Sequence, residues 1–349
     1  MAHVATITID HTKVPGDLTD YVGLIVPDAS AGYSALYALC LEGGGDIRLF
    51  KSDDTTELAR EIVSFSVTDE TGEIHYKYAG TLSSSVDTDI HVYADGSSSD
   101  YAVGATYGRN NVWGAFELVW HMREGSGTTV SDSTGNGHIG NFENSPAWTS
   151  SGLFGNAVSF SAATSNKRVR ATGVKASDLN INGANARTVS WWAKQDSGGA
   201  SGWPMSVGAN SSNAMFTSRY LGSNNWRLNS FGGDLDYTQA STDGNWILQH
   251  AMYSGSALEA YVNGVDKGNY SRTINTSDGT DFQIGNAVDA NVQYKGLISS
   301  VRVKSSRISD NALTTEYNNQ DSYSTFYSVA AVAGGSAAQA ARRGAVMMM

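Results

Sequence analysis

The sequence predicts an all-β protein built from two β-sandwich domains, and three observations support this class. Short runs that alternate apolar and polar residues recur at intervals of about ten residues along most of the chain. No long segment shows the 3.6-residue apolar period of a helix. Glycine is abundant, with 38 residues, whereas proline occurs only 4 times. Regular short strands separated by turns are typical of sandwiches.

The first domain is predicted at residues 1–110. Its expected strands cover residues 4–10, 21–27, 46–50, 61–67, 73–79 and 89–95. Residues 28–45 have room for one short helix. A glycine- and serine-rich stretch at 96–114 contains few candidate core residues, so we place the domain boundary there.

The second domain is predicted at 111–322 and is followed by a C-terminal tail at 323–349. Its expected strands cover residues 115–122, 155–161, 187–195, 204–209, 215–221, 225–231, 246–254, 257–264, 281–287 and 296–305. Asn263 and Gly264 predict a hairpin turn, because both residue types tolerate positive φ. Residues 309–320 predict one short helix, with Ser309 or Asp310 as the N-cap.

Composition excludes several classes of protein. The chain has 34 acidic and 23 basic residues and a net charge of -11, so it has no basic surface for nucleic acid. Cys40 is the single cysteine, so no intrachain disulfide is expected. The first residues lack a signal-peptide pattern. There is also no apolar run of about 18 residues that could span a membrane.

The second half carries a series of motifs in a familiar order. They read "LVWHMREGSGTTVSDSTGNGHIGNF", "GLFGNAVSF", "RTVSWWAKQ", "YVNGV" and "FQIGNA". Together they resemble the laminin-G-like, concanavalin A-type jelly roll of bacterial surface proteins, over residues 115–320. The first domain is similar to a bacterial domain of unknown function that often precedes such a jelly roll. That second resemblance implies a β-sandwich and no particular chemistry.

Jelly rolls of this type often bind glycans, and the segment 196–245 has the composition of a sugar-binding face. Aromatic rings can stack on sugars, while amides and carboxylates can hydrogen-bond to them. An ordinary sandwich with a few exposed aromatic residues would show the same pattern. The candidate carbohydrate contacts are Trp203, Tyr220, Trp226, Phe231, Tyr237, Asn224 and Asp234.

The segment "DSTGNG" at 132–137 is a candidate calcium site. Asp132 and Asn136 offer the hard oxygen ligands that calcium prefers. The alternative is a glycine-rich turn in which these side chains bond the backbone. The resemblance favours that alternative, because the family's usual acidic pair is replaced here by Ser299 and Ser300.

We expect no enzymatic activity. Concanavalin A-like hydrolases usually carry their carboxylates as Glu-x-Asp-x-x-Glu on one strand, and this chain lacks that motif. The seven histidines are scattered, without metal-ligand spacing. No nucleophile elbow or P-loop occurs at a strand-to-helix turn. Apart from the candidate calcium ion, no cofactor is expected.

The C-terminal tail predicts attachment to other proteins. It is rich in alanine and glycine and ends in an apolar tip, which would promote association if left exposed. Methionine suits such a contact because its side chain adapts to irregular pockets. The candidate assembly residues are Arg342, Arg343, Val346, Met347, Met348 and Met349.

Combined with the missing signal peptide, this tail predicts a virion protein of a tailed bacteriophage. The protein would be assembled in the host cytoplasm and displayed on the virion surface as a decoration, head fibre or minor tail protein. It would form a homo-oligomer and present the jelly roll to host-surface glycans. The alternatives are a secreted or cell-surface lectin-like adhesin and a non-catalytic module of a glycan-processing system.

Overall fold

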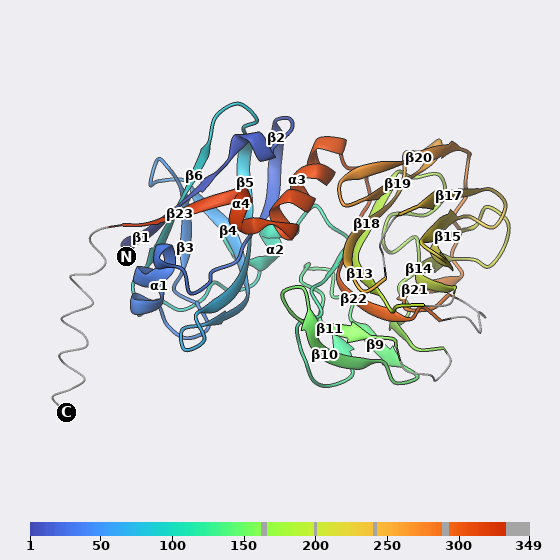
Figure 1. Cartoon of the computed structure of the whole chain (residues 1–349), viewed down its shortest axis with the longest axis horizontal. Coiled ribbons are helices and arrows are strands. Elements are labelled where there is room, and N and C mark those ends of the chain that lie inside the picture. The colour runs from blue at the N-terminus through green and yellow to red at the C-terminus, as the bar shows by residue number, and fades with distance from the viewer. Residues whose placement is uncertain (162–165, 199–200, 240–242, 288–292, 333–349) are drawn as a thin grey trace. The chain divides into compact units, whose positions relative to one another are not determined.

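The computed structural model describes residues 1–161, 166–198, 201–239, 243–287 and 293–332. It forms two compact units, shown in Figure 1. The first unit joins Met1–Trp113 to the C-terminal segment that begins at Asp310, and the second unit is Gly114–Ser309. Strands dominate both units, which confirms the predicted all-β class. No helix in these ranges is both long and apolar enough to cross a membrane.

The first unit is built on a seven-stranded antiparallel arrangement in the order β2-β5-β4-β3-β6-β1-β23. The strands are β1 (Ala2–Ile9), β2 (Leu18–Ile25), β3 (Arg48–Lys51), β4 (Glu57–Ser66), β5 (Thr71–Leu82), β6 (Thr88–Ala94) and β23 (Tyr327–Ala331). Short helices connect them: η1 (His11–Lys13), η2 (Ala31–Tyr33), α1 (Ser34–Leu39), α2 (Arg109–Val112), α3 (Asp310–Asp321) and α4 (Tyr323–Phe326).

Strand β4 connects the two halves of this arrangement. Its first residues, Glu57 and Leu58, pair with β3, whereas the rest of the strand pairs with β5. Apolar side chains from both halves then meet in one buried core; for example, Ile7 and Leu49 lie with Ile74. A strand that changes partners along its length lets two sheets share a core without a free edge between them.

The C-terminal segment corrects the predicted domain ends at 322 and 323. The sequence predicts helix α3 within the second domain and an extended tail after residue 322. In the structure, β23 pairs with β1 and Phe326 is fully buried in the first unit's core. The Asn319 amide also donates to Leu24 O (2.8 Å) and accepts from Leu24 N (2.7 Å) on edge strand β2. Helix α3 therefore satisfies backbone groups of an otherwise open edge.

The second unit contains two sheets. The back sheet has the order β10-β11-β22-β13-β18-β19-β20, with β7 (Leu118–Trp120) paired to β22. Its strands are β10 (Ala147–Gly152), β11 (Gly155–Ser159), β13 (Arg187–Gln195), β18 (Trp246–Tyr253), β19 (Ala257–Val262), β20 (Val265–Ser271) and β22 (Gly296–Lys304). The hairpin predicted between β19 and β20 is present, with φ of 53° at Asn263 and 72° at Gly264.

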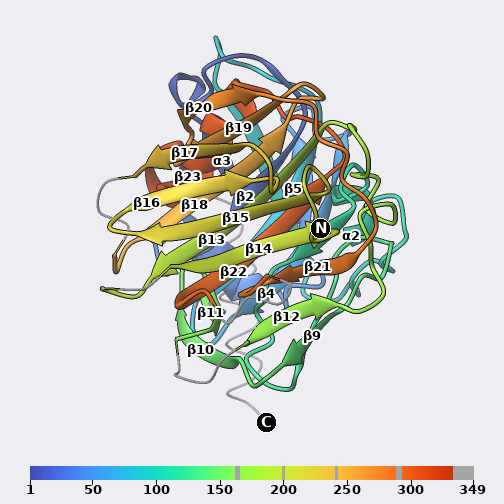
Figure 2. The same ribbon diagram turned by 90° about the vertical axis from the view of Figure 1, so that its right-hand side faces the viewer.

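The front sheet has the order β17-β16-β15-β14-β21-β12-β9-β8, and Figure 2 shows its strands facing the viewer. Its strands are β8 (Thr129–Val130), β9 (Gly140–Glu143), β12 (Arg168–Ala171), β14 (Gly202–Gly208), β15 (Met215–Gly222), β16 (Asn225–Asn229), β17 (Asp234–Thr238) and β21 (Thr280–Ile284). The inner faces of both sheets enclose one large apolar core, which includes Trp120, Trp191 and Phe282.

Candidate functional site

The outer face of the front sheet carries a continuous row of polar residues, one from every strand. Strand pairing places these residues side by side: Thr129, Asn141, Arg170, Gln283, Ser206, Thr217, Asn229 and Asp234. The neighbouring row points into the core and includes Val169, Ile284 and Met205. Because side chains alternate between faces along a strand, the polar row belongs to the outer face.

The residues in the middle of this polar row are buried and hydrogen-bonded to the segment that follows β21. Gln283 and Ser206 are fully buried. The Gln283 amide donates to Ser206 Oγ (3.2 Å) and to Asn286 O (3.1 Å). The Ser206 hydroxyl donates to the same Asn286 carbonyl (3.2 Å). These hydrogen bonds therefore hold Asn286, in the segment after β21, against the sheet, and they leave Gln283 and Ser206 inaccessible to a ligand.

One flank presents charged and aromatic side chains on strands β15 to β17. We call it the β15–β17 patch and define it by Trp203, Arg219, Arg227, Phe231, Asp234 and Asp236. Arg219, Arg227 and Asp236 lie directly opposite one another on adjacent strands. Arg227 forms a two-pronged ion pair with Asp236, with N–O distances of 2.5 and 2.7 Å. Its remaining nitrogen contacts Asp234 Oδ2 at 3.0 Å.

The ion pair with Arg227 holds the Asp236 carboxylate in its ionised form. Hydrogen bonds from Arg227 lower the pKa of Asp236, and the same bonds raise the pKa of Arg227. Both groups therefore stay charged over the ordinary pH range, because each stabilises the ionised form of the other. The second oxygen of Asp234, Oδ1, has no hydrogen-bond partner among the described residues.

Trp203 and Phe231 form the aromatic part of the patch. Their rings are nearly parallel, at 10°, with centroids 5.9 Å apart. The Arg219 guanidinium lies 4.8 Å from the centre of the Trp203 ring, so Trp203 is only 6% exposed. Phe231 remains half-buried and is the ring that solvent can reach.

The backbone of Phe231 adopts an unusual conformation. Its φ is +56°, which a bulky residue rarely adopts. The Asn229 side chain holds it there by accepting a hydrogen bond from Phe231 N (2.5 Å). Two glycines follow, and Asn229 itself belongs to the polar row. Such strain costs roughly 1–3 kcal/mol, persists only where its surroundings impose it, and is frequent at binding sites.

Three of the predicted carbohydrate contacts are corrected by the structure. Tyr220, Trp226 and Tyr237 lie in the apolar core and are 1%, 0% and 8% exposed. All three project from the inner face, and Tyr220 and Trp226 contact each other with centroids 5.0 Å apart. A ring enclosed on both faces cannot stack on a sugar. The composition of the segment suggested these residues as sugar contacts, but the alternation of side chains along each strand directs them into the core.

The other predicted contacts have different positions. Phe231 and Asp234 belong to the patch, and Trp203 lies beneath Arg219. Asn224 occupies the β15–β16 turn, where its backbone N–H donates to Tyr220 Oη (3.3 Å). Arg219, Arg227 and Asp236 were not predicted. The sequence contained a sign of them, because each is a charged residue at an outward position of a strand in which apolar and polar residues alternate.

The two candidate calcium ligands, Asp132 and Asn136, use their side chains to hydrogen-bond the backbone. Asp132 is 6% exposed, and its carboxylate already accepts four hydrogen bonds. The donors are Val119 N (3.0 Å), Thr134 N (3.0 Å), Thr134 Oγ1 (2.7 Å) and His138 N (2.9 Å). Asn136 points its amide nitrogen at Glu117 O (3.0 Å). This matches the alternative in which the side chains bond the backbone, so we do not propose calcium here.

The predicted assembly residues lie outside the described part of the chain. They are Arg342, Arg343, Val346, Met347, Met348 and Met349.

Comparison with known proteins gives one family match, within residues 168–314. The model of the concanavalin A-like lectin/glucanases superfamily matches residues 168–314. A search of curated proteins found no match.

Among solved structures, the binding domain of botulinum neurotoxin serotype G is 13% identical, with a TM-score of 0.46. The alignment covers 59% of this chain and 51% of that one. The binding domain of Paraclostridial Mosquitocidal Protein 1 is also 13% identical, with a TM-score of 0.44 and coverages of 59% and 52%. The chain thus spans about half the length of these structures.

Proposed function

We propose that this chain, which carries a concanavalin A-like domain at residues 168–314, is a glycan-binding protein whose ligand lies against the β15–β17 patch. The observation that carries the proposal is Phe231, a half-buried ring held at positive φ beside charged side chains. A protein that needed only packing at this position would gain stability from a relaxed residue.

The patch offers the two kinds of contact that a sugar requires. Phe231 provides an apolar ring for the C–H face of a pyranose. Asp236 and Arg227 provide paired acceptors and donors at fixed spacing for hydroxyl groups. Asn225 is exposed next to them on β16 and adds an amide. Rigid strands carry most of these groups, so little side-chain entropy would be lost on binding.

The same geometry supports binding rather than hydrolysis. Glycoside cleavage requires one carboxylic acid that is protonated and can donate to the leaving oxygen. Asp234 and Asp236 both contact Arg227 instead, and the pKa of Asp236 is lowered by that contact. Asp236 is therefore poorly suited to act as a general acid.

Replacing the Phe231 ring tests the binding proposal. We expect the purified chain to bind a subset of sugars on a glycan array, and Phe231→Ala to weaken that binding about tenfold, or about 1.4 kcal/mol. Tyr270→Ala is the matched control, because Tyr270 is an exposed aromatic residue (41%) on β20 of the back sheet. Binding should survive this change.

Two outcomes would count against the proposal. One is an array with no bound sugar, and the other is equal binding by wild type and Phe231→Ala. Thermal unfolding of each variant separates lost contact from lost fold, because a folded Phe231→Ala protein that fails to bind has lost the contact alone.

We also propose that the protein is attached to a bacteriophage virion through residues 333–349. The support is compositional: the segment has two arginines before an apolar tip. Removing residues 333–349 should abolish incorporation into particles while the two folded units keep their melting temperatures. Normal incorporation of the shortened chain would exclude this attachment and favour the cell-surface adhesin.

A further inference from the structure

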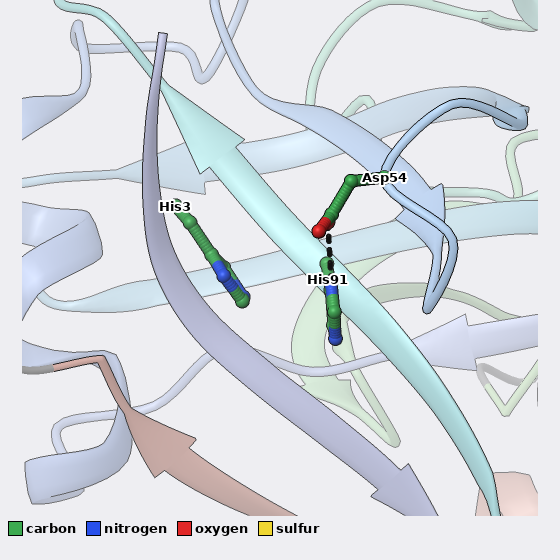
Figure 3. A group of neighbouring side chains, drawn as sticks. All are labelled: His3, Asp54 and His91. Carbon is green, nitrogen blue, oxygen red and sulfur yellow. Dashed lines mark hydrogen bonds and ion pairs between the residues drawn. The ribbon is translucent and has the colours of Figure 1, made fainter.

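Two histidines and an aspartate from distant parts of the sequence meet in the first unit, as Figure 3 shows. His3 lies on β1 and His91 on the neighbouring strand β6. Asp54 lies in the turn between β3 and β4, at φ of 58°. One potential ligand atom from each residue falls within 4.8 Å of the other two. The scattered spacing of the histidines gave no sign of this group.

Strand register explains the convergence. His3 pairs with Tyr93, and Thr6 pairs with His91, around an irregularity in β1 between His3 and Ala5. The two imidazoles consequently lie on one face, with ring centroids 4.3 Å apart. The β3–β4 turn brings Asp54 over them, and its Oδ1 lies 2.5 Å from His91 Nδ1. The Tyr93 hydroxyl donates to the same oxygen (2.8 Å).

A hydrogen bond to the backbone orients the His3 imidazole. The His3 Nε2 atom contacts the Ala5 carbonyl at 3.0 Å. A proton on that nitrogen leaves Nδ1 with the lone pair.

We propose that His3, Asp54 and His91 form a binding site for a divalent transition-metal ion of the zinc class. Two imidazole nitrogens and one carboxylate oxygen are a common ligand set for Zn²⁺. Three protein ligands leave a fourth tetrahedral position for water or for a group from another molecule. Small rotations of the side chains would bring the ligand atoms to the usual distances of about 2.0–2.2 Å.

A second cluster of the same unit is a poorer candidate. Asp10, His11 and Asp87 also lie close together, but they include one histidine only. Its Asp10 carboxylate caps helix η1, where Oδ1 accepts hydrogen bonds from Thr12 N (2.8 Å) and Thr12 Oγ1 (2.7 Å), so occupied carboxylate oxygens are common to both clusters. Imidazole nitrogen is the ligand that distinguishes zinc-class sites from sites for magnesium or calcium. The cluster of Asp10, His11 and Asp87 therefore provides a control site for the zinc experiment described below.

Binding at the proposed site would stabilise the first unit. The ion would link β1, β6 and the β3–β4 turn. An ion that binds only the folded state raises the free energy of unfolding by RT ln(1 + [L]/Kd). At a concentration of about 100 times Kd, the population of unfolded chains falls about a hundredfold.

Zinc titration of the full chain tests the proposal. The protein should carry no affinity tag and be stripped with a chelator, since added histidines would compete for the ion. Calorimetry with Zn²⁺ should give one site per chain, and zinc should raise the melting temperature. Co²⁺ should bind with visible absorption bands of tetrahedral coordination. His91→Gln, His3→Gln and Asp54→Asn should each weaken zinc binding at least tenfold.

Two matched variants locate the site. His11→Gln alters the second cluster, and His138→Gln removes a histidine from the second unit; both should bind zinc as the wild type does. The proposal is overturned if zinc does not bind saturably, if the His3 and His91 variants retain wild-type affinity, or if His11→Gln abolishes binding. Asp54 is exposed, so Asp54→Asn keeps the test decisive even if a histidine variant fails to fold.

Discussion

A chain that ends at Ser309 is expected to lose the fold of its first unit while the second unit remains folded. The truncation removes β23 from its pairing with β1, and it removes Phe326 and Tyr327 from the core. Loss of one buried Phe alone costs about 3–5 kcal/mol, against a total stability of about 5–15 kcal/mol for a domain. Removal of Asn319 would also leave the backbone N–H and C=O of Leu24 without their hydrogen-bond partner.

Calorimetry should show this effect as the loss of one of two unfolding transitions. Limited proteolysis should then degrade residues before 114 and leave the second unit intact. The matched control ends at Val332, which keeps β23 and should unfold as the full chain does. Two preserved transitions in the shorter chain would show that the C-terminal segment is dispensable for the first unit.

Trp226→Ala is expected to destabilise the second unit by about 3–5 kcal/mol, because Trp226 is fully buried in its core. The indole packs against Tyr220 and is enclosed by both sheets, so its removal leaves a cavity as well as lost apolar contact. For a unit of this size, the melting temperature of the second unit should fall by roughly 10 °C. Calorimetry measures that shift, and the melting temperature of the first unit should not change.

The same variant separates packing from sugar contact. Trp226→Phe keeps most of the buried volume and should recover much of the stability. Glycan binding by Trp226→Ala should persist at temperatures where the second unit is still folded. A Trp226→Ala protein of unchanged melting temperature that had lost glycan binding would refute the placement of Trp226 in the core.

Much of the fold could be predicted from local patterns. The strands follow the alternation of apolar and polar residues, because one face of each strand must be buried. The Asn263–Gly264 turn was predictable because few other pairs adopt positive φ at both positions. Helix α3 was likewise expected from its polar start at Asp310 and its apolar spacing. The motifs between residues 115 and 320 identified the jelly roll, which the family model confirms at 168–314.

The candidate sites were less predictable, because each depends on neighbours that are distant in sequence. Composition marked the segment around Trp226 as rich in aromatic residues, but only strand pairing decided which rings face the core. Phe231 could not be distinguished from Tyr220 by residue type, since its exposure results from the backbone turn that Asn229 holds.

The sequence by itself determined the all-β class, most strand positions and the jelly roll, since these depend on residue period and on short motifs. Tertiary structure alone decided that β23 returns to pair with β1, that three predicted sugar contacts are core residues, and that His3, Asp54 and His91 converge. The physical reason is that pairing between distant strands depends on the register and packing of the whole sheet, which local periodicity does not encode.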